Sequence, residues 1–303
     1  MFFRNLTFFR FPASLAKAFA ELDARLEDHR LKPVGPSELI TRGFVSPFGR
    51  DEPAMSLRLN DTVWITLGGE ERLLPSAVIN DELAKRIEAM EEKEGRKLGG
   101  RARKRVKEDL VVELLPRAFV RPMRTSATLD LQHGFIAVDA SSRKSAENVV
   151  SELRHALGSF PALPLNAEVS ARAVLTGWIA GEPLPAGLVL GDECELKDPI
   201  DGGAVVKCQR QELLCDEIKK HLESGKQVTR LALVLDDHVS FVLGEDLVVR
   251  KLKFLDGVVD QLEGTDRDGI QAELTARYAL MAAELKRLFA VLEVALKFSP
   301  AEA

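Results

Sequence analysis

The chain has 303 residues, of which 46% are hydrophobic and 29% charged, and its formal net charge is −5. These values exclude a disordered or collagen-like chain and leave room for about two globular domains. No apolar run approaches the roughly 20 residues of a membrane span. The opening residues, MFFRNLTFFRF, lack the apolar core and cleavage site of a signal peptide. Cys194, Cys208 and Cys215 lack CxxC spacing, which argues against a zinc site or a disulfide framework and favours the cytoplasm.

The first 70 residues predict a strand, a helix, a loop and a hairpin. Aromatic alternation predicts a strand over Met1–Pro12, and Ser14 caps a predicted amphipathic helix that ends at His29. The glycines and prolines between Pro33 and Pro53 predict a loop. A hairpin is expected around Asn60-Asp61, from two short strands within residues 55–68.

Residues 80–125, which we call the finger, predict two antiparallel helices. Leu83, Ile87 and Met90 form a helical stripe after an N-cap at Asn80 or Asp81. Gly99-Gly100 should break the helix and form the tip. A second stripe, made of Val106, Leu110 and Leu114, ends at Pro116, because proline cannot continue a helix.

The finger concentrates the positive charge of an acidic chain. Between residues 96 and 124 there are ten basic residues and three acids, so this piece carries +7 and the remainder −12. Such one-signed clustering favours a polyanion-binding patch, although a charge run on helices is as often a solvated face. The basic residues are Arg96, Lys97, Arg101, Arg103, Lys104, Arg105, Lys107, Arg117, Arg121 and Arg124.

The chain after Pro116 should be extended, with Arg117, Phe119 and Arg121 on one face. An aromatic ring between two arginines is suited to nucleic acid, by stacking and phosphate contact. A core or interface role is more common for such a phenylalanine.

The remainder of the chain alternates predicted strands and helices. Strands are expected over 128–131 and 135–138, followed by a helix from Ser141 or Ser142 to Leu157 and another over Val169–Ile179. The glycine- and proline-rich link GEPLPAG marks a domain boundary at about residue 181. Beyond it we expect strands near 188–190, 204–208, 228–236, 239–244 and 247–255, and a helix over Cys215–Glu223. A long terminal helix is expected over Asp266–Lys297, with an apolar stripe made of Ile270, Leu274, Tyr278, Met281, Leu285, Leu288, Leu292 and Leu296.

Sequence signatures of enzymes are absent: there is no Walker A, GxGxxG, HExxH or GxSxG motif. Asp236, Asp237 and His238 could form a divalent-metal site of a nuclease. A polar pair that closes a hairpin between two apolar strands is the simpler interpretation.

Several segments in order resemble the bacterial RdgC family of recombination-associated proteins over essentially the whole chain. They are FFRNLTFFRF, LLPSAVI, EGRKLGGRARK, LLPRAF, GSFPALPL and KQVTRLAL, of which LLPRAF with the basic helix before it is the most specific. The resemblance implies a nucleoid-associated, sequence-nonspecific binder of duplex DNA. It implies a homodimer closed into a ring, antagonism of RecA-mediated strand exchange, no enzymatic activity and no cofactor.

The resemblance also assigns residues. Phe119 falls where the family closes one of its two subunit contacts, and Arg96, Lys97 and Arg117 match basic family positions. Arg210 replaces a family lysine, which keeps the charge but changes the contact geometry. Together with the charge map, this predicts DNA contacts at Arg96, Lys97, Arg101, Arg103, Lys104, Arg105, Lys107, Arg117, Arg121 and Arg210.

We therefore expect an α+β protein with mixed or antiparallel sheets, the finger and a long C-terminal helix. Its expected regions are 1–79 with 126–180, the inserted finger at 80–125, and 181–303. A protein-interaction adaptor that binds the recombinase through the finger is the main alternative, and a metal-dependent nuclease is the third.

Overall fold

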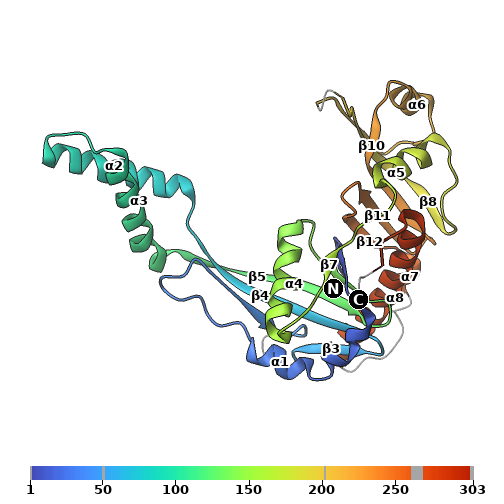
Figure 1. Ribbon diagram of the computed structural model, residues 1–303, viewed down its shortest axis with the longest axis horizontal. Coiled ribbons are helices and arrows are strands. Elements are labelled where there is room, and N and C mark those ends of the chain that lie inside the picture. The colour runs from blue at the N-terminus through green and yellow to red at the C-terminus, as the bar shows by residue number, and fades with distance from the viewer. Residues whose placement is uncertain (1, 50–51, 201–202, 261–268, 301–303) are drawn as a thin grey trace. The chain divides into compact units, whose positions relative to one another are not determined.

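The computed structural model describes residues 2–49, 52–200, 203–260 and 269–300 (Figure 1). It confirms a mixed α and β chain with antiparallel sheets and a long C-terminal helix. Within the described ranges, no helix is both long and apolar enough to cross a membrane. The chain packs as two compact units, one made of residues 1–28, 46–66 and 125–303, the other of residues 29–45 and 67–124.

The first unit contains two sheets. In one sheet the strand order is β4-β5-β6-β1-β7, with β3 beside β4. Its strands are β1 (Thr7–Arg10), β3 (Ser56–Leu59), β4 (Thr62–Leu73), β5 (Phe119–Asp130), β6 (Phe135–Val138) and β7 (Leu163–Pro164). The other sheet has the order β12-β11-β10-β8-β9. Its strands are β8 (Leu188–Lys197), β9 (Val205–Gln209), β10 (Gln227–Leu235), β11 (Val239–Gly244) and β12 (Val249–Phe254).

Helices cover these sheets and supply much of the core. They are α1 (Leu22–Asp28), α4 (Arg143–Leu157), α5 (Ala171–Ala180), α6 (Asp216–Glu223), α7 (Asp256–Val259) and α8 (Ile270–Leu296). The predicted stripe of α8 is buried from Tyr278 to Leu296, and Phe289 stacks on Phe135 with ring centroids 4.2 Å apart. Residues 266–268 of the predicted terminal helix lie outside the described residues.

The segment before β1 ties the two sheets together. The backbone N–H of Leu6 donates to the carbonyl of Val249 at 2.8 Å, and the N–H of Val249 donates back to the carbonyl of Leu6 at 3.0 Å. Leu6 and Val249 are both fully buried. One core therefore runs through both sheets of the first unit, with α5 and α8 packed into it.

The second unit contains β2 (Ile40–Val45), the outer parts of β4 and β5, and two helices. The helices are α2 (Ser76–Glu94) and α3 (Gly100–Leu114), and a 3₁₀ turn (Leu115–Arg117) leads from α3 into β5. The order of strands is β2-β4-β5. The ends of β4 and β5 thus carry the helical pair (Figure 1).

Most of the predicted elements are present, and β2 and the two-residue β7 are strands that were not predicted. The hairpin around Asn60-Asp61, the helix α4 with its αL cap at Gly158, and the strands of the second sheet are confirmed. The predicted loop over 33–53 contains β2, whose Phe44 exchanges backbone hydrogen bonds with residues 29 and 31. A Cβ on Gly43 would lie 2.5 Å from the backbone of Leu31, so glycine permits this close approach.

Several predicted boundaries are wrong. The first strand covers only Thr7–Arg10, and the helix expected over 14–29 is a 3₁₀ segment (Ala13–Phe19) followed by α1. Helix α2 begins at Ser76, with Pro75 at the N-cap, rather than after an N-cap at residue 80 or 81. The strand predicted at 128–131 is the end of the longer β5, and Arg117 lies in the 3₁₀ turn instead of on that strand.

Candidate nucleic-acid interface

The turn between α2 and α3 is built by glycine and one carboxylate. Gly95 ends α2 in the left-handed region, at φ 66°, and its N–H donates to the carbonyl of Glu91 at 2.9 Å. The Glu91 carboxylate accepts the backbone N–H of Leu98 at 2.8 Å and the Arg103 guanidinium at 3.0 Å. Gly99 and Gly100 start α3. A break between two helices is present as predicted, but Gly95 and not Gly99-Gly100 ends α2, and the tip spans residues 95–99.

The two helices pack through a narrow apolar contact. Val106 and Leu110 of α3 are buried, whereas none of the described residues of α2 is. Arg86 of α2 donates to Glu113 of α3 at 2.9 Å. A helical pair with so little buried surface relies on its ends and its ion pairs to keep its register.

The base of the pair depends on Arg72, which sequence reasoning missed. Its guanidinium donates to the carbonyls of Gly35, Leu115, Pro116 and Ala118, at 3.1 to 3.3 Å. The carbonyls of Leu115, Pro116 and Ala118 belong to the turn that follows α3, where helical partners run out, and that of Gly35 belongs to the segment before β2. No local pattern marks Arg72, because its acceptors lie more than 30 residues away on either side.

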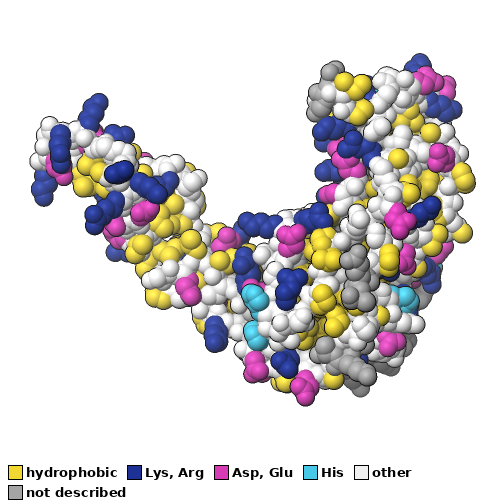
Figure 2. Space-filling view, in the orientation of Figure 1, with side chains coloured by type: hydrophobic (Ala, Val, Ile, Leu, Met, Phe, Trp, Pro, Cys, Tyr) yellow, Lys and Arg dark blue, Asp and Glu magenta, His cyan; other side chains and the backbone are white. Residues whose placement is uncertain are grey.

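The predicted DNA contacts of the finger are all exposed, and Figure 2 shows lysine and arginine side chains gathered over the helical pair. The contacts fall into two groups. Four of them pair with acids: Arg96 with Glu94, Arg103 with Glu91, Lys104 with Glu108, and Arg121 with Glu71. In the part of the chain that the structure describes, no ion pair involves the other five, which are Lys97, Arg101, Arg105, Lys107 and Arg117. These five are available to a phosphate without breaking an existing contact.

Arg210 lies in the first unit, immediately after β9, and not among the finger cations. Its side chain is exposed, and its backbone has φ 57°, a conformation that glycine and asparagine adopt more readily than arginine does. The unusual backbone fixes the direction in which the chain leaves β9. It gives Arg210 a structural constraint that the sequence alone did not indicate.

Phe119 is 85% exposed at the start of β5. Other apolar side chains of the second unit are also open to solvent, among them Val112 of α3, which is 64% exposed, and Leu73 and Val78. The predicted core role is therefore excluded for Phe119 in the single chain. Contiguous exposed apolar side chains are typical of a protein-interaction surface.

A shallow groove of about 580 Å³ runs along α2. Its floor is apolar, from Leu83, Ala84 and Ile87, and carboxylates of α2 flank it. Leu83 and Ile87 of the predicted α2 stripe are only half-buried, and they line an open groove instead of packing fully against another element. Like the exposed side chains around Phe119, this groove is apolar surface of the second unit that no other described segment covers.

The alternative metal site is not assembled by the fold. Asp236 and Asp237, at φ 51° and 54°, form the tight turn between β10 and β11, which confirms the hairpin interpretation. Asp236 pairs with Arg287, and His238 lies 3.1 Å from Glu284. Among the described residues, no three His, Cys, Asp or Glu side chains are grouped so that they could hold a metal ion.

The cysteines also lack the features of a nucleophile. Cys194 and Cys208 face each other across β8 and β9, and the structure shows all three cysteines as free thiols. Burial raises the pKa of the Cys194 thiol to about 12, with a smaller contribution from Cys208. A thiol with so high a pKa is almost entirely protonated at neutral pH and is a poor nucleophile.

Comparison with known proteins places the whole chain in one family. The family model described as "Putative exonuclease, RdgC" matches residues 1–299. The chain is 68% identical to the recombination-associated protein RdgC of Xanthomonas axonopodis pv. citri (strain 306) over 303 residues, the full length of both. It is 62% identical to the protein of that name from Xylella fastidiosa (strain 9a5c), over 99% of both chains. This chain is therefore a member of the RdgC family of recombination-associated proteins.

Proposed function

We propose that this protein binds duplex DNA without reading its sequence and thereby limits the access of RecA to DNA during recombination. Phosphate contacts from the finger would supply the affinity. The observation that carries the proposal is the set of five exposed finger cations without an ion pair in the described chain, within a segment of charge +7. The relatives' name, which states an association with recombination, supports the biological setting.

Charge separation would direct DNA to the finger. The remainder of the chain carries −12, so a polyanion is repelled elsewhere and attracted to one segment. The cations are lysines and arginines, most of them on the helical pair and its connecting turn. Such contacts position a protein on the phosphate backbone and carry no sequence information.

We further propose that two copies associate and close into a ring around the duplex. Phe119, Val112 and the apolar groove of α2 are open to solvent in the single chain, and a second copy could cover them. Phe119 would then be an anchor of one subunit contact, with its ring buried and the guanidinium groups of Arg117 and Arg121 still hydrated. A closed ring would retain circular DNA by topology as well as by contact.

An adaptor that binds the recombinase is the second candidate, favoured by the apolar groove and its carboxylates. DNA binding and adaptor binding differ in their response to salt. Binding that releases counterions weakens log-linearly as salt rises, whereas a contact with an apolar groove changes little. The proposal includes no bond cleavage and no cofactor, and it expects the protein in the cytoplasm, on the nucleoid.

A salt series on linear and nicked-circular duplexes tests the proposal directly. The expected result is sequence-independent binding whose affinity falls steeply with salt, together with slower release from the circle. Equal affinity at all salt concentrations, or no binding at low salt, would overturn it. Incubation of end-labelled duplex with magnesium tests the exonuclease description of the family, and progressive shortening of the strand would contradict a purely binding role.

A further inference from the structure

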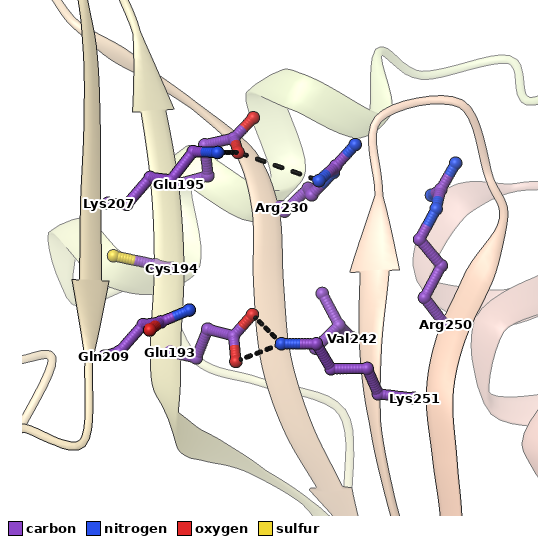
Figure 3. Close-up of a pocket in the computed structure, with 9 residues that line it drawn as sticks. All are labelled: Glu193, Cys194, Glu195, Lys207, Gln209, Arg230, Val242, Arg250 and Lys251. Atoms are coloured by element: carbon purple, nitrogen blue, oxygen red, sulfur yellow. Dashed lines mark hydrogen bonds and ion pairs between the residues drawn. The ribbon is translucent and has the colours of Figure 1, made fainter.

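The open face of the second sheet carries a cluster of paired charges (Figure 3). The cluster lines a cavity of about 140 Å³ over β8, β9, β10 and β12, all within the first unit. Three of its cations are Lys207, Arg230 and Lys251, and its two carboxylates are Glu193 and Glu195. None of these residues belongs to the finger.

Glu195 holds two of the cations by strand register. It is the cross-strand partner of Lys207 on β9 and of Arg230 on β10. One of its oxygens lies 3.4 Å from the Lys207 ammonium and 3.7 Å from the Arg230 guanidinium, and the other accepts the Thr229 hydroxyl at 3.1 Å. Opposite charges at facing positions of neighbouring strands stabilise their pairing.

Glu193 holds the third cation through an irregularity in β12. Ser240 pairs with Lys253 and Val242 with Arg250, so two residues of β12 oppose one of β11. Such a bulge redirects a side chain, and Lys251 has φ 54° at this point. Lys251 therefore extends over the sheet and donates to both oxygens of Glu193, at 2.6 and 2.7 Å.

The carboxylates are more enclosed than the cations that they hold. The Lys251 side chain is 57% exposed and its partner Glu193 is 26% exposed. Lys207 and Arg230 are likewise more exposed than Glu195. The cation heads can therefore turn toward solvent while the carboxylates stay on the sheet. Arg250 differs, because it makes two hydrogen bonds to Asp246, at 2.9 and 2.5 Å, and is only 20% exposed.

We propose that this sheet face is a second phosphate-contacting surface, whose affinity is set by Glu193 and Glu195 as built-in competitors of the DNA backbone. Lys207, Arg230 and Lys251 would exchange a carboxylate for a phosphate when a duplex arrives. This inference rests on the proposed DNA binding and adds to it a location and a means of tuning. The carboxylates keep the face at +1, so that it assists the finger without holding DNA strongly by itself.

The chemistry of the face favours a phosphodiester backbone over an acidic protein. Stable protein interfaces have an apolar centre, whereas the apolar side chain at this cavity, Val242, is buried beneath the charges. Three half-exposed cations on neighbouring strands suit a ligand with regularly spaced charge. If the spacing of the ligand's charges did not matter, the same cations would also bind polyglutamate. That polymer therefore serves as the competing probe.

The test is a gain of binding, which misfolding cannot imitate. Glu193→Gln with Glu195→Gln raises the net charge of the five residues from +1 to +3. We expect the full-length variant to bind a short duplex roughly tenfold more tightly near 0.1 M salt, with a log–log salt slope steeper by up to about 2 × 0.9 units. Arg230→Gln with Lys251→Gln should weaken binding and flatten the slope. Glu147→Gln, which removes a carboxylate paired with Arg143 on α4, is the matched control and should change neither quantity.

The outcomes separate this inference from the proposed function. Absence of DNA binding by the unmodified protein contradicts the proposed function itself. If the unmodified protein binds and the double glutamine variant has the same affinity and slope, only the sheet-face inference is wrong. A gain for polyglutamate without a gain for duplex DNA would also overturn it. Melting temperatures of both double variants close to that of the parent show that the fold is retained.

Discussion

Glu91 and Arg103 join the end of α2 to the first turn of α3 by an ion pair of 3.0 Å across the glycine turn. The oxygen that receives the Arg103 guanidinium also accepts the N–H of Leu98. One finger cation is thus committed to the architecture of the turn, while its neighbours Arg101 and Arg105 extend into solvent. Charge count alone does not separate these two roles, and they predict different behaviour on mutation.

Arg101→Gln with Arg105→Gln should weaken DNA binding without changing the melting temperature. Loss of two phosphate contacts flattens the log–log salt slope by about 2 × 0.9 units on duplex DNA. Titrations at several salt concentrations on two unrelated sequences measure this effect. Arg86→Gln, which removes a cation already paired with Glu113, is the control, and an equal loss for both variants would show that the finger acts only through net charge.

Glu91 should make the glycine turn sensitive to acid. The N–H of Leu98, and then Arg103, hold the pKa of the Glu91 carboxyl below its usual value. A carboxyl whose pKa is lower in the folded state stabilises that state above its unfolded pKa, and the contribution is lost as the pH falls through the folded pKa. Protection of the Leu98 amide from hydrogen exchange should therefore be lower in Glu91→Gln at neutral pH, and the difference between the two proteins should shrink as the pH falls below the ordinary glutamate pKa of about 4.3. A constant difference across the whole pH range would contradict this role.

Phe119→Ala should leave the single chain folded, because the ring is 85% exposed there. If the ring anchors a subunit contact, its loss can cost about 2 kcal/mol of binding free energy, which is roughly a thirtyfold change in the equilibrium constant of that contact. Retention on a closed circular duplex should fall more than binding to a short linear one. An equal loss on both DNAs would make Phe119 an ordinary DNA contact.

Val112→Ala is the matched control for Phe119, since this α3 side chain is also exposed and apolar. A smaller effect than that of Phe119→Ala indicates a localised anchor. Equal effects of the two substitutions would indicate a broad apolar contact instead, and no effect of either would exclude both from a subunit interface.

Arg210→Asn should lower DNA affinity by a few fold without lowering the melting temperature. Asparagine tolerates the left-handed backbone at φ 57°, so it removes the charge and keeps the conformation. Arg210→Ala is the companion variant, because it also removes the charge and, like arginine, carries a Cβ in this left-handed conformation. A lower melting temperature with unchanged affinity for Arg210→Asn would make the residue structural.

Tyr278, the single tyrosine of the chain, gives a direct measure of core integrity. Its hydroxyl lies 2.8 Å from that of Thr128, and burial raises the pKa of the phenol to about 12. Because the pKa is raised, the buried neutral phenol contributes its full stabilisation of the folded state below the unfolded pKa near 10. This contribution is lost as the pH rises through the folded pKa. Near-ultraviolet absorbance should therefore show ionisation only at strongly alkaline pH. A midpoint close to 10 while the fold persists would show that the ring is solvated.

The elements that sequence patterns predicted well are those in which one physical signal dominates. The stripe of α8, the Ser142 and Gly158 ends of α4 and the Asp236-Asp237 turn each follow from periodicity or turn chemistry within a few residues. The missed features depend on distant partners. Strand β2 exists because residues 29–31 bond to Phe44, and Arg72 finds its acceptors on chain segments far away in sequence.

The same contrast holds for the candidate site. Clustering in the sequence located the finger cations, whereas the division between Arg103 and its unpaired neighbours required the position of Glu91, 12 residues earlier. Lys207, Arg230 and Lys251 lie on three separate segments, and strand register with one bulge brings them to one face. Sequence spacing gives no sign of this arrangement.

The backbone pairing of Leu6 with Val249 also has a consequence for synthesis on the ribosome. Residue 6 is made 243 residues before its partner, which at about 5–20 residues per second is an interval of roughly 12 to 50 seconds. During that time the aromatic segment around Leu6 has no second sheet to pair with. The segment around Leu6 can therefore form its full backbone pairing only after β12, the last strand of that sheet, has been made. Chaperone binding to the nascent chain would be most useful before residue 249 emerges.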